Sequence, residues 1–308
     1  MGELATVDII VVSFNSGEFL DGCLDSIGTG ASAGLAINIL VVDNASTDGT
    51  PDRVEARTEP WIRLKRNEGN LGFAAAANIG IRETRGEYIL LLNPDTVLSP
   101  DAVRAAVTFL QETDDAAIVS PKLVLQGGAI DPGCHRGFPT PWASFTYLAG
   151  LEKFFPKVRL FNGYHRWDLP LDEVHAVDAV SGAFMLFRRS LVDRIGLFDE
   201  RFFMYAEDVD FCMRAKQAGG RVYYDPRQEV VHIKGTSTGI KRHSDHISQA
   251  NLETRKRALN AFYDSTKLFY DKHYAEGNPR PLKWAVHLAV EVTRPLANWR
   301  LKRRMRTT

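Results

Sequence analysis

The sequence predicts an α/β fold, in which a mainly parallel β-sheet carries helices on both faces and a helical extension follows at the carboxyl-terminal end. Two observations lead to this fold class. Runs such as residues 7–13 and 37–43 are mostly apolar, which is typical of strands buried on both faces. Helical segments separate these runs along the first third of the chain, and this alternation favours parallel strands joined by crossover helices.

The local patterns predict the individual elements. The expected strands span residues 7–13, 37–43, 62–66, 88–93, 177–188, 222–224 and 230–233. The expected helices span residues 18–27, 73–84, 100–112 and 207–218, and another begins at or near Pro51. Residues 126–176 are rich in Gly, Pro, His and aromatic residues and have weak periodicity, which is typical of a functional loop or lid. From His246 onward the chain is expected to be helical, with breaks at 277–279 and at Pro281.

Composition narrows the class of protein. The 308 residues are 44% hydrophobic and 25% charged, which excludes a disordered or collagen-like chain. Basic and acidic residues both number 38, so a nucleic-acid partner is not expected. The stretch 294–308 holds six basic residues and no acid, which indicates a tail that meets an anionic surface.

Cysteine usage and hydropathy indicate a cytoplasmic protein. The three cysteines, Cys23, Cys134 and Cys212, are far apart and form neither a disulfide framework nor a zinc-site spacing. The first apolar run lacks the features of a signal peptide. No stretch approaches the roughly 20 apolar residues that span a bilayer.

Polar residues follow the expected strands at the edge where ligands bind in open α/β sheets. The loop at 13–17 contains neither the glycine pattern of dinucleotide-binding proteins nor a phosphate-binding P-loop, and by itself it is typical of a turn. Asp43 ends the second strand, where its carboxylate can accept a hydrogen bond from a nucleobase N–H, although 43–50 also fits a turn with a helix cap. Asn93 and Asp95 follow the strand expected at 88–93, and their side chains project from the same face of the sheet. They fit either a divalent cation site or a turn that ends the strand.

Seven segments in chain order together resemble one family. They are residues 12–15, VVDNASTDGT at 41–50, Asn70 to Phe73 with Asn78 and Gly80, Asn93 to Asp95, Ser181 to Ala183, GLFDERFFMYAEDVDFCMRAKQAGG at 196–220, and VVHIKGTST at 230–238. On these segments the chain resembles the inverting family 2 glycosyltransferases, which have the Rossmann-like GT-A fold. Within that family it is most similar to bacterial rhamnosyltransferases of cell-surface polysaccharide synthesis.

The resemblance implies a domain plan and a set of ligand contacts. A catalytic domain would span 1–240, with a nucleotide half at about 1–125 and an acceptor half at about 126–240, and 241–308 would form the helical extension with its basic tail. The implied contacts to the nucleotide sugar are Ser13, Phe14, Asn15, Asp43, Asn70, Gly72, Asn78, Asn93 and Asp95, with Asp43 on the pyrimidine base. The implied acceptor contacts are Asp178, Ser181 and Gly182.

The resemblance also implies a metal site. Asp95 matches the metal-binding aspartate of the family's DxD motif, but Asn93 replaces the first aspartate, so the site loses one negative charge. His232 matches a histidine that completes metal coordination in such enzymes; without the family it would be interpreted as an ordinary strand histidine. A carboxylate with an imidazole accepts either Mg²⁺ or Mn²⁺.

The acidic pair Glu207-Asp208 opens the helix at 207–218. By position it is typical of an acidic first turn that complements the helix dipole. The family places its general base at this pair, and sugar transfer needs a carboxylate to take the acceptor's proton. We expect Asp208 to be the base, with Glu207 as its supporting partner or as the alternative base.

These assignments predict the reaction and its partners. The chain is expected to transfer L-rhamnose from dTDP-rhamnose to a polyprenyl-diphosphate-linked saccharide; the alternatives are a UDP-sugar-dependent hexosyl-, N-acetylhexosaminyl- or galactofuranosyltransferase, or an inactive nucleotide-sugar-binding protein. Residues 281–306 combine aromatic, aliphatic and basic residues, which favours a helix in the membrane interface at the inner face of the cell membrane. The rival interpretation is a helix packed on the core or on the second subunit of a homodimer.

Overall fold

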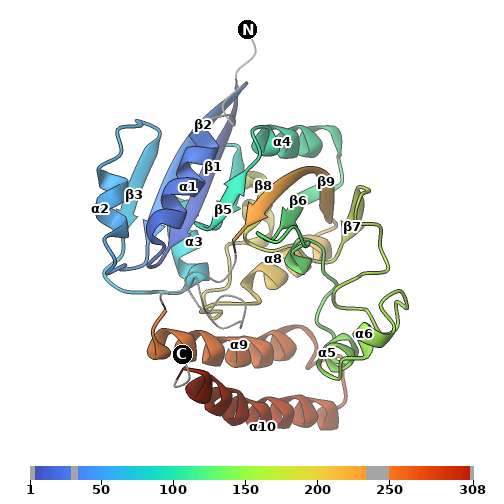
Figure 1. The fold of residues 1–308 in the computed structure, drawn as a ribbon. Helices are drawn as coiled ribbons and strands as arrows, with labels where there is room; N and C mark the ends of the chain where they lie inside the picture. Colours follow the sequence, from blue (N-terminus) through green and yellow to red (C-terminus); the bar gives the residue numbers. More distant parts are fainter. Residues whose placement is uncertain (1–3, 29–33, 234–249, 306–308) are drawn as a thin grey trace.

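The computed structural model describes residues 4–28, 34–233 and 250–305, which form one α/β body with two long carboxyl-terminal helices (Figure 1). The strands are β1 (Ala5–Ser13), β2 (Leu35–Asp43), β3 (Ile62–Arg66), β4 (Tyr88–Leu92), β5 (Thr96–Leu98), β6 (Ala116–Val124), β7 (His175–Val177), β8 (Phe184–Arg188) and β9 (Arg221–His232). The helices are α1 (Gly17–Gly28), α2 (Thr50–Glu55), α3 (Phe73–Glu83), α4 (Ala102–Glu112), α5 (Pro141–Leu148), α6 (Leu151–Phe154), α7 (Arg189–Ile195), α8 (Glu207–Gln217), α9 (Leu252–His273) and α10 (Arg280–Arg304), with a 3₁₀ turn at Pro132–Cys134. The expected α/β class is confirmed.

The first half of the sheet is parallel, as its apolar runs predict. Strands β3, β2, β1 and β4 are neighbours in that order, and all three pairings are parallel. The register aligns Ser13 with Asp43 and Asp43 with Arg66, so the ends of three strands form one edge. Glycine at position 80 lets α3 approach this half closely, because a Cβ there would lie 2.5 Å from Ile10 Cγ2.

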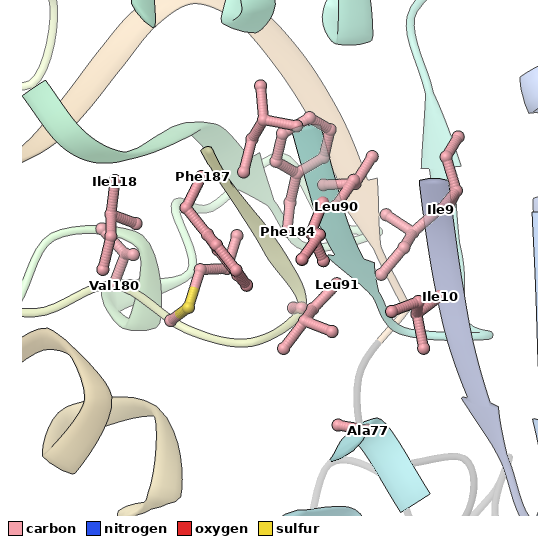
Figure 2. Packing of buried hydrophobic residues seen from close by; sticks show 14 of the residues in the cluster. Ile9, Ile10, Ala77, Leu90, Leu91, Ile118, Val180, Phe184 and Phe187 are labelled. Carbon is pink, nitrogen blue, oxygen red and sulfur yellow. The ribbon is translucent and has the colours of Figure 1, made fainter. Parts of the chain in front are cut away.

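The second half of the sheet differs from the expected parallel arrangement. The sheet continues in the order β4-β8-β6-β9-β5; β8 is antiparallel to both neighbours, and only the β6–β9 pair is parallel. The complete sheet is therefore mixed. Figure 2 shows Ile9 and Ile10 of β1, Leu90 of β4 and Phe184 and Phe187 of β8 in one continuous core across the two halves.

Several element boundaries also differ from the sequence expectation. The strand expected at 177–188 is two strands, β7 and β8, separated by an irregular segment around Ser181-Gly182. The two short strands expected at 222–224 and 230–233 are one strand, β9, with a register shift against β6. The expectation omitted β5, which is only three residues long, and β6, which contains a proline at position 121. It also omitted α7, as well as the helices α5 and α6, which lie within the segment 126–176 that was expected to be a loop.

The carboxyl-terminal region forms two packed helices below the sheet domain in the view of Figure 1. The expected break at 277–279 separates α9 from α10, but Pro281 lies in the first turn of α10 and does not interrupt it. Buried Asp210 of α8 fastens α9 to the domain through Lys272 and His273, each 2.7 Å away. In the described part of the chain no helix is long and apolar enough to cross a membrane. Residues 234–238, the boundary expected at 240 and the expected helix start at His246 lie outside the described residues.

Candidate active site

The carboxyl end of β2 holds Asp43 in a local network. Its side chain is 1% exposed, and one carboxylate oxygen accepts a hydrogen bond from Ser46 N at 2.9 Å while the other accepts from Ser46 Oγ. Ser46 Oγ in turn accepts from Asn15 N at 2.8 Å, and Asn15 Oδ1 accepts from Thr47 N at 2.8 Å. The turn expected at 43–50 is therefore present. Its hydrogen bonds fix Asp43 at the end of β2 beside the 13–15 loop. Binding of the pyrimidine base of the nucleotide by Asp43 stays a prediction.

The loop that leads from β3 to α3 closes the same edge. Asn70 Oδ1 accepts a hydrogen bond from Gly72 N at 3.0 Å, and Asn44 Nδ2 donates to Gly72 O at 3.0 Å. Gly72 has a φ of +88° and a ψ of 172°, a conformation open essentially only to glycine. A Cβ there would lie 2.3 Å from Phe203 O, the atom that also accepts from Phe73 N. The structure thus uses Gly72 to bring this loop against residue 203.

We expect Gly72→Ala to lower the free energy of unfolding by about 2 kcal/mol or more, because it combines a disfavoured φ with a backbone clash. Gly69→Ala is the matched control in the same loop, since a Cβ at Gly69 meets no atom within 4 Å. Urea unfolding of both variants checks this. Equal stability of the two would show that the close approach to Phe203 is not required.

Asn78 forms its hydrogen bonds away from the strand ends, with Phe198 and Glu200. Its Nδ2 donates to Phe198 O at 2.8 Å and to Glu200 Oε1 at 2.9 Å, and its Oδ1 accepts from Phe198 N at 3.0 Å. These bonds use both donors of the amide and one acceptor site, and the residue is 1% exposed. The structure therefore gives Asn78 a contact between α3 and the segment before α8, and the nucleotide-sugar contact expected for it remains untested.

His232, Asp95 and Asn93 meet where β5 pairs with the end of β9. Thr96 lies opposite His232 in the antiparallel ladder, which places the preceding Asp95 beside the imidazole. Asp95 Oδ1 lies 3.4 Å from His232 Nε2, and Asn93 Nδ2 lies 3.4 Å from the same nitrogen. Burial opposes a charge on His232, but Asp95 and Asp131 outweigh it and raise the pKa of His232 to about 9.

The donor atoms fit a divalent cation in type and spacing. Two donors 3.4 Å apart can both lie about 2.2 Å from one ion, and a carboxylate with an imidazole suits Mn²⁺ or Mg²⁺. Asn93 supplies a neutral amide where a second carboxylate would add charge. Among residues 4–28, 34–233 and 250–305, no group of three or more His, Cys, Asp and Glu side chains is arranged to hold a metal ion. Such a cation would therefore need donor atoms from the nucleotide or water.

Asp131 contacts His232 in the candidate metal site, and the sequence expectation did not include it. Its Oδ2 lies 2.8 Å from His232 Nδ1, and its Oδ1 accepts from Gly133 N at 2.9 Å. A carboxylate on the far ring nitrogen orients a metal-binding histidine and fixes its tautomer. Asp131 belongs to the weakly periodic 126–176 segment, where the Asp-Pro-Gly turn at 131–133 was the only local signal.

The acidic pair opens α8 after two backbone outliers. Tyr205 and Ala206 have φ values of +69° and +65°, which are unusual for non-glycine residues and often mark functional sites. Asp208 Oδ2 accepts from Arg136 Nη2 at 2.6 Å, and the Gly182 N–H points at the same oxygen from 3.4 Å. Burial disfavours the charged guanidinium, but the nearby Asp208 carboxylate raises the pKa of Arg136. Arg136 is a second residue of the irregular segment that the expectation missed.

Glu207 differs from Asp208 in its surroundings. Burial, and then the charge of Asp208, raises the pKa of Glu207 to about 8. Its Oε2 atom is buried and has no hydrogen-bond partner among the described residues. The structure therefore pairs an arginine-bound carboxylate with a carboxyl group that holds its proton at neutral pH.

This difference predicts a pH-dependent stability. In the folded chain Glu207 stays protonated up to about pH 8, whereas its unperturbed pKa is 4.5, so its contribution to stability is present below 4.5 and is lost as the pH rises through 8. We expect Glu207→Gln, which is always neutral, to gain stability relative to the parent chain as the pH rises. Urea unfolding from about pH 4.5 to above pH 8 measures this, because the contribution is lost across that interval. The exposed control Glu68→Gln should show no such trend. A constant difference for Glu207→Gln would contradict the buried-proton assignment.

The segment 181–183 connects the two chemical groups. Ala183 O accepts from Asn93 N at 3.1 Å, and Gly182 N points at Asp208. A Cβ on Gly182 would touch the Phe73 ring at 3.3 Å, which links this segment to the Gly72 loop. Ser181 and Gly182, expected to contact the acceptor, therefore lie between the candidate metal residues and the candidate base.

Asp178 is engaged with α8. Its carboxylate forms an ion pair with Lys216 and accepts a hydrogen bond from Phe138 N at 3.4 Å. Through these contacts Asp178 joins α8 to Phe138 of the irregular segment. The acceptor contact expected for Asp178 remains a prediction.

Comparisons with known proteins show the family of the chain. The family model described as glycosyl transferase family 2 matches residues 8–196, and the chain belongs to this family. The chain is 29% identical over 289 residues to the N-acetylglucosaminyl-diphospho-decaprenol L-rhamnosyltransferase of Mycobacterium tuberculosis. The matched region covers 90% of this chain and 88% of that protein. It is 28% identical over 177 residues to the rhamnosyltransferase WbbL of Escherichia coli K12, covering 53% of this chain and 61% of that protein.

Solved structures confirm the fold. The mannosyltransferase PcManGT of Pyrobaculum calidifontis, in complex with GDP-Man and Mn²⁺, matches with a TM-score of 0.57 at 20% identity, over 96% of this chain and 72% of that one. TarS of S. aureus matches with a TM-score of 0.54 at 17% identity, over 94% and 90% of the two chains. The chain is therefore a glycosyltransferase with the GT-A-type fold, as the sequence predicts.

Proposed function

We propose that this glycosyltransferase moves L-rhamnose from dTDP-rhamnose to a polyprenyl-diphosphate-linked saccharide and inverts the anomeric configuration. The observation that carries the proposal is the position of segment 181–183 between Asn93 and Asp208. A donor diphosphate near Asn93 and Asp95 and an acceptor hydroxyl near Asp208 would then meet at one sugar. The mycobacterial relative, which is named for a lipid-linked acceptor and for rhamnose, supports the choice of substrates.

The nucleotide end of the donor is assigned to the parallel half of the sheet. Asp43 would accept a hydrogen bond from the N3–H of thymine or uracil, and the 13–15 loop would line the base and ribose. The bonds from Ser46 hold the carboxylate in place before the donor arrives. Because Asp43 accepts equally from thymine and uracil, the sugar pocket and not the base must distinguish the donors.

The diphosphate end is assigned to Asp95, His232 and Asn93. A divalent cation bound by Asp95 and His232 would neutralise the charge that grows on the leaving diphosphate. Asp131 would hold the His232 ring so that Nε2 faces the diphosphate. The Asn93 amide would donate to a phosphate oxygen.

Asp208 is assigned as the general base. Its Oδ2 is held by Arg136, which keeps a negative carboxylate in a buried place and fixes its direction. The acceptor hydroxyl attacks the anomeric carbon from the face opposite the diphosphate, Asp208 takes the hydroxyl proton, and the bond to the diphosphate breaks. Glu207, protonated beside it, would donate a hydrogen bond to the acceptor or sugar.

The lipid-linked acceptor implies a position at the inner face of the membrane, reached through α10. The exposed apolar residues Trp284, Leu288, Val292, Leu296 and Trp299 recur every three or four positions and form one stripe. The opposite face packs on α9, where Arg294 pairs with Asp264 at 2.6 Å. The rival interpretation of core packing therefore explains one face of α10, and the stripe is left for a bilayer or a second subunit.

A transfer assay with a panel of dTDP- and UDP-sugars, a polyprenyl-diphosphate-linked acceptor and Mg²⁺ or Mn²⁺ tests the proposal. Thermal shift on the same panel reports donor binding separately from turnover. We expect dTDP-rhamnose to give both stabilisation and product, and NMR of the product to show an inverted anomeric centre. Transfer from a UDP-sugar alone would replace the donor, and binding without any product would contradict the catalytic proposal.

A further inference from the structure

The irregular segment 126–176, whose helices α5 and α6 lie in the lower right of Figure 1, carries a group of exposed apolar residues. The group consists of Trp142, Phe145, Tyr147, Leu148, Phe154, Phe155, Val158 and Leu160, which we call the 142–160 surface. Leu148 and Phe154 are each 77% exposed. Large apolar side chains gathered in this way mark an interaction site in a soluble chain.

The helix α5 within this surface buries small residues and exposes its large apolar residues. Its inward side consists of Ala143 and Thr146, which are buried, whereas Trp142, Phe145 and Leu148 face outward at every third position. A helix that packs only on its own domain would have the large apolar residues inside. The pattern therefore provides a face for something outside the chain.

The surface is held in a fixed shape. Trp142 Nε1 donates to Leu160 O at 2.8 Å and ties its two ends together, and Asn162 Nδ2 donates to Pro156 O at 2.6 Å. At the base of the segment, Gly137 approaches Gly163 so closely that a Cβ would lie 1.9 Å from Gly163 O. The exposed side chains are thus presented by a closed unit.

The charge on this surface is of one sign. Lys153, Lys157 and Arg159 are exposed among the apolar residues, and within the described part of the chain no carboxylate forms an ion pair with them. The only acid between residues 141 and 160 is Glu152, which is buried and bonded to His165 at 2.8 Å. Apolar side chains beside unpaired cations match the interface of an anionic bilayer. Two copies of this surface facing each other would instead bring six cations together.

We propose that the 142–160 surface inserts shallowly into the interface of an anionic membrane. This gives the protein a membrane contact separate from α10. The segment that carries this surface begins next to Arg136, which pairs with Asp208. Its two ends are joined by a hydrogen bond from Gly137 N to Tyr164 O at 2.8 Å. Insertion would therefore hold the candidate base close to the membrane surface. Only one part of this inference rests on the proposed function, namely that the lipid-linked acceptor reaches Asp208 from the membrane. Binding to vesicles needs neither donor nor acceptor.

Vesicle flotation of the full-length chain tests the proposal, with phosphatidylcholine vesicles alone and mixed with phosphatidylglycerol. We expect the parent chain to float with the mixed vesicles, and Leu148→Ser with Phe154→Ser to lower the bound-to-free ratio roughly tenfold or more. Lys157→Gln with Arg159→Gln should lower binding to mixed vesicles and leave binding to neutral ones unchanged. The matched control is Leu4→Ser with Trp61→Ser, which removes two exposed apolar side chains outside the surface.

Two further measurements separate the alternatives. Trp284→Ser with Leu288→Ser reports the contribution of α10, so that loss of binding in that variant alone would contradict insertion by the 142–160 surface. Vesicles with brominated acyl chains should quench the fluorescence of Trp142, and Trp142→Phe should remove that quenched fraction. Unchanged flotation of Leu148→Ser with Phe154→Ser, or a change in its sedimentation mass instead, would overturn the proposal in favour of a protein partner. Transfer to a water-soluble acceptor by that variant should equal the parent rate, which keeps this test distinct from the test of the reaction.

Discussion

Replacing Asp208 with asparagine is expected to lower turnover by about a thousandfold while donor affinity stays close to that of the parent chain. The substitution keeps the shape of the side chain and its bond from Arg136, but the amide cannot take the acceptor's proton. Single-turnover kinetics with a saturating donor, together with donor titration by calorimetry, measure the two quantities separately.

The comparison variants sharpen this result. Asp193→Asn changes an exposed acid on α7 in the same way and should keep the parent turnover. Glu207→Gln should lower turnover much less than Asp208→Asn, because Glu207 already holds its proton at neutral pH. If Glu207→Gln abolished turnover and Asp208→Asn did not, the roles of the two residues would be reversed.

Asp95→Asn is expected to lower turnover by about a hundredfold or more and to remove stimulation by Mn²⁺ or Mg²⁺. The variant keeps the size of the side chain and removes the only carboxylate in the Asn93–Asp95 turn. Treatment of the parent chain with a chelator should give a similar loss, which added metal restores. A variant that still responds fully to metal would exclude Asp95 as a ligand.

Asp131→Asn should behave differently from Asp95→Asn. Because Asp131 bonds the far nitrogen of His232, its loss should raise the metal concentration for half-maximal activity by about tenfold to a hundredfold. Turnover at saturating metal should stay near the parent value. Asp114→Asn, an exposed acid after α4, is the control for both variants. A loss of turnover that metal cannot restore would make Asp131 a purely structural residue.

Most of the parallel half of the fold was predictable because β1, β2 and β4 contain long apolar runs. Val41 and Leu90, for example, are completely buried, so the pattern of their strands is unambiguous. The antiparallel half was less predictable, because pairing direction depends on tertiary contacts that no local pattern records. In this half, β5 was missed because it is three residues long, β6 because it contains Pro121, and β9 was divided at its register shift.

The candidate site was likewise predicted only in part. Asp43, Asp95, Asp208 and His232 were predicted from matching segments, and the structure places Asp95 beside His232 and a Gly182 N–H near Asp208. Arg136 and Asp131 lie in the irregular segment 72 and 101 residues from their partners in sequence, so no spacing could connect them. Asn78 matched the family pattern, but only the structure showed its bonds to Phe198 and Glu200.

A crystal structure with dTDP and Mn²⁺ tests the central assignment most directly. The site described above predicts the thymine ring beside Asp43, the diphosphate next to Asn93, and an anomalous manganese signal between Asp95 and His232. Nucleotide bound at another place on the molecule, or manganese bound away from these two side chains, would contradict it.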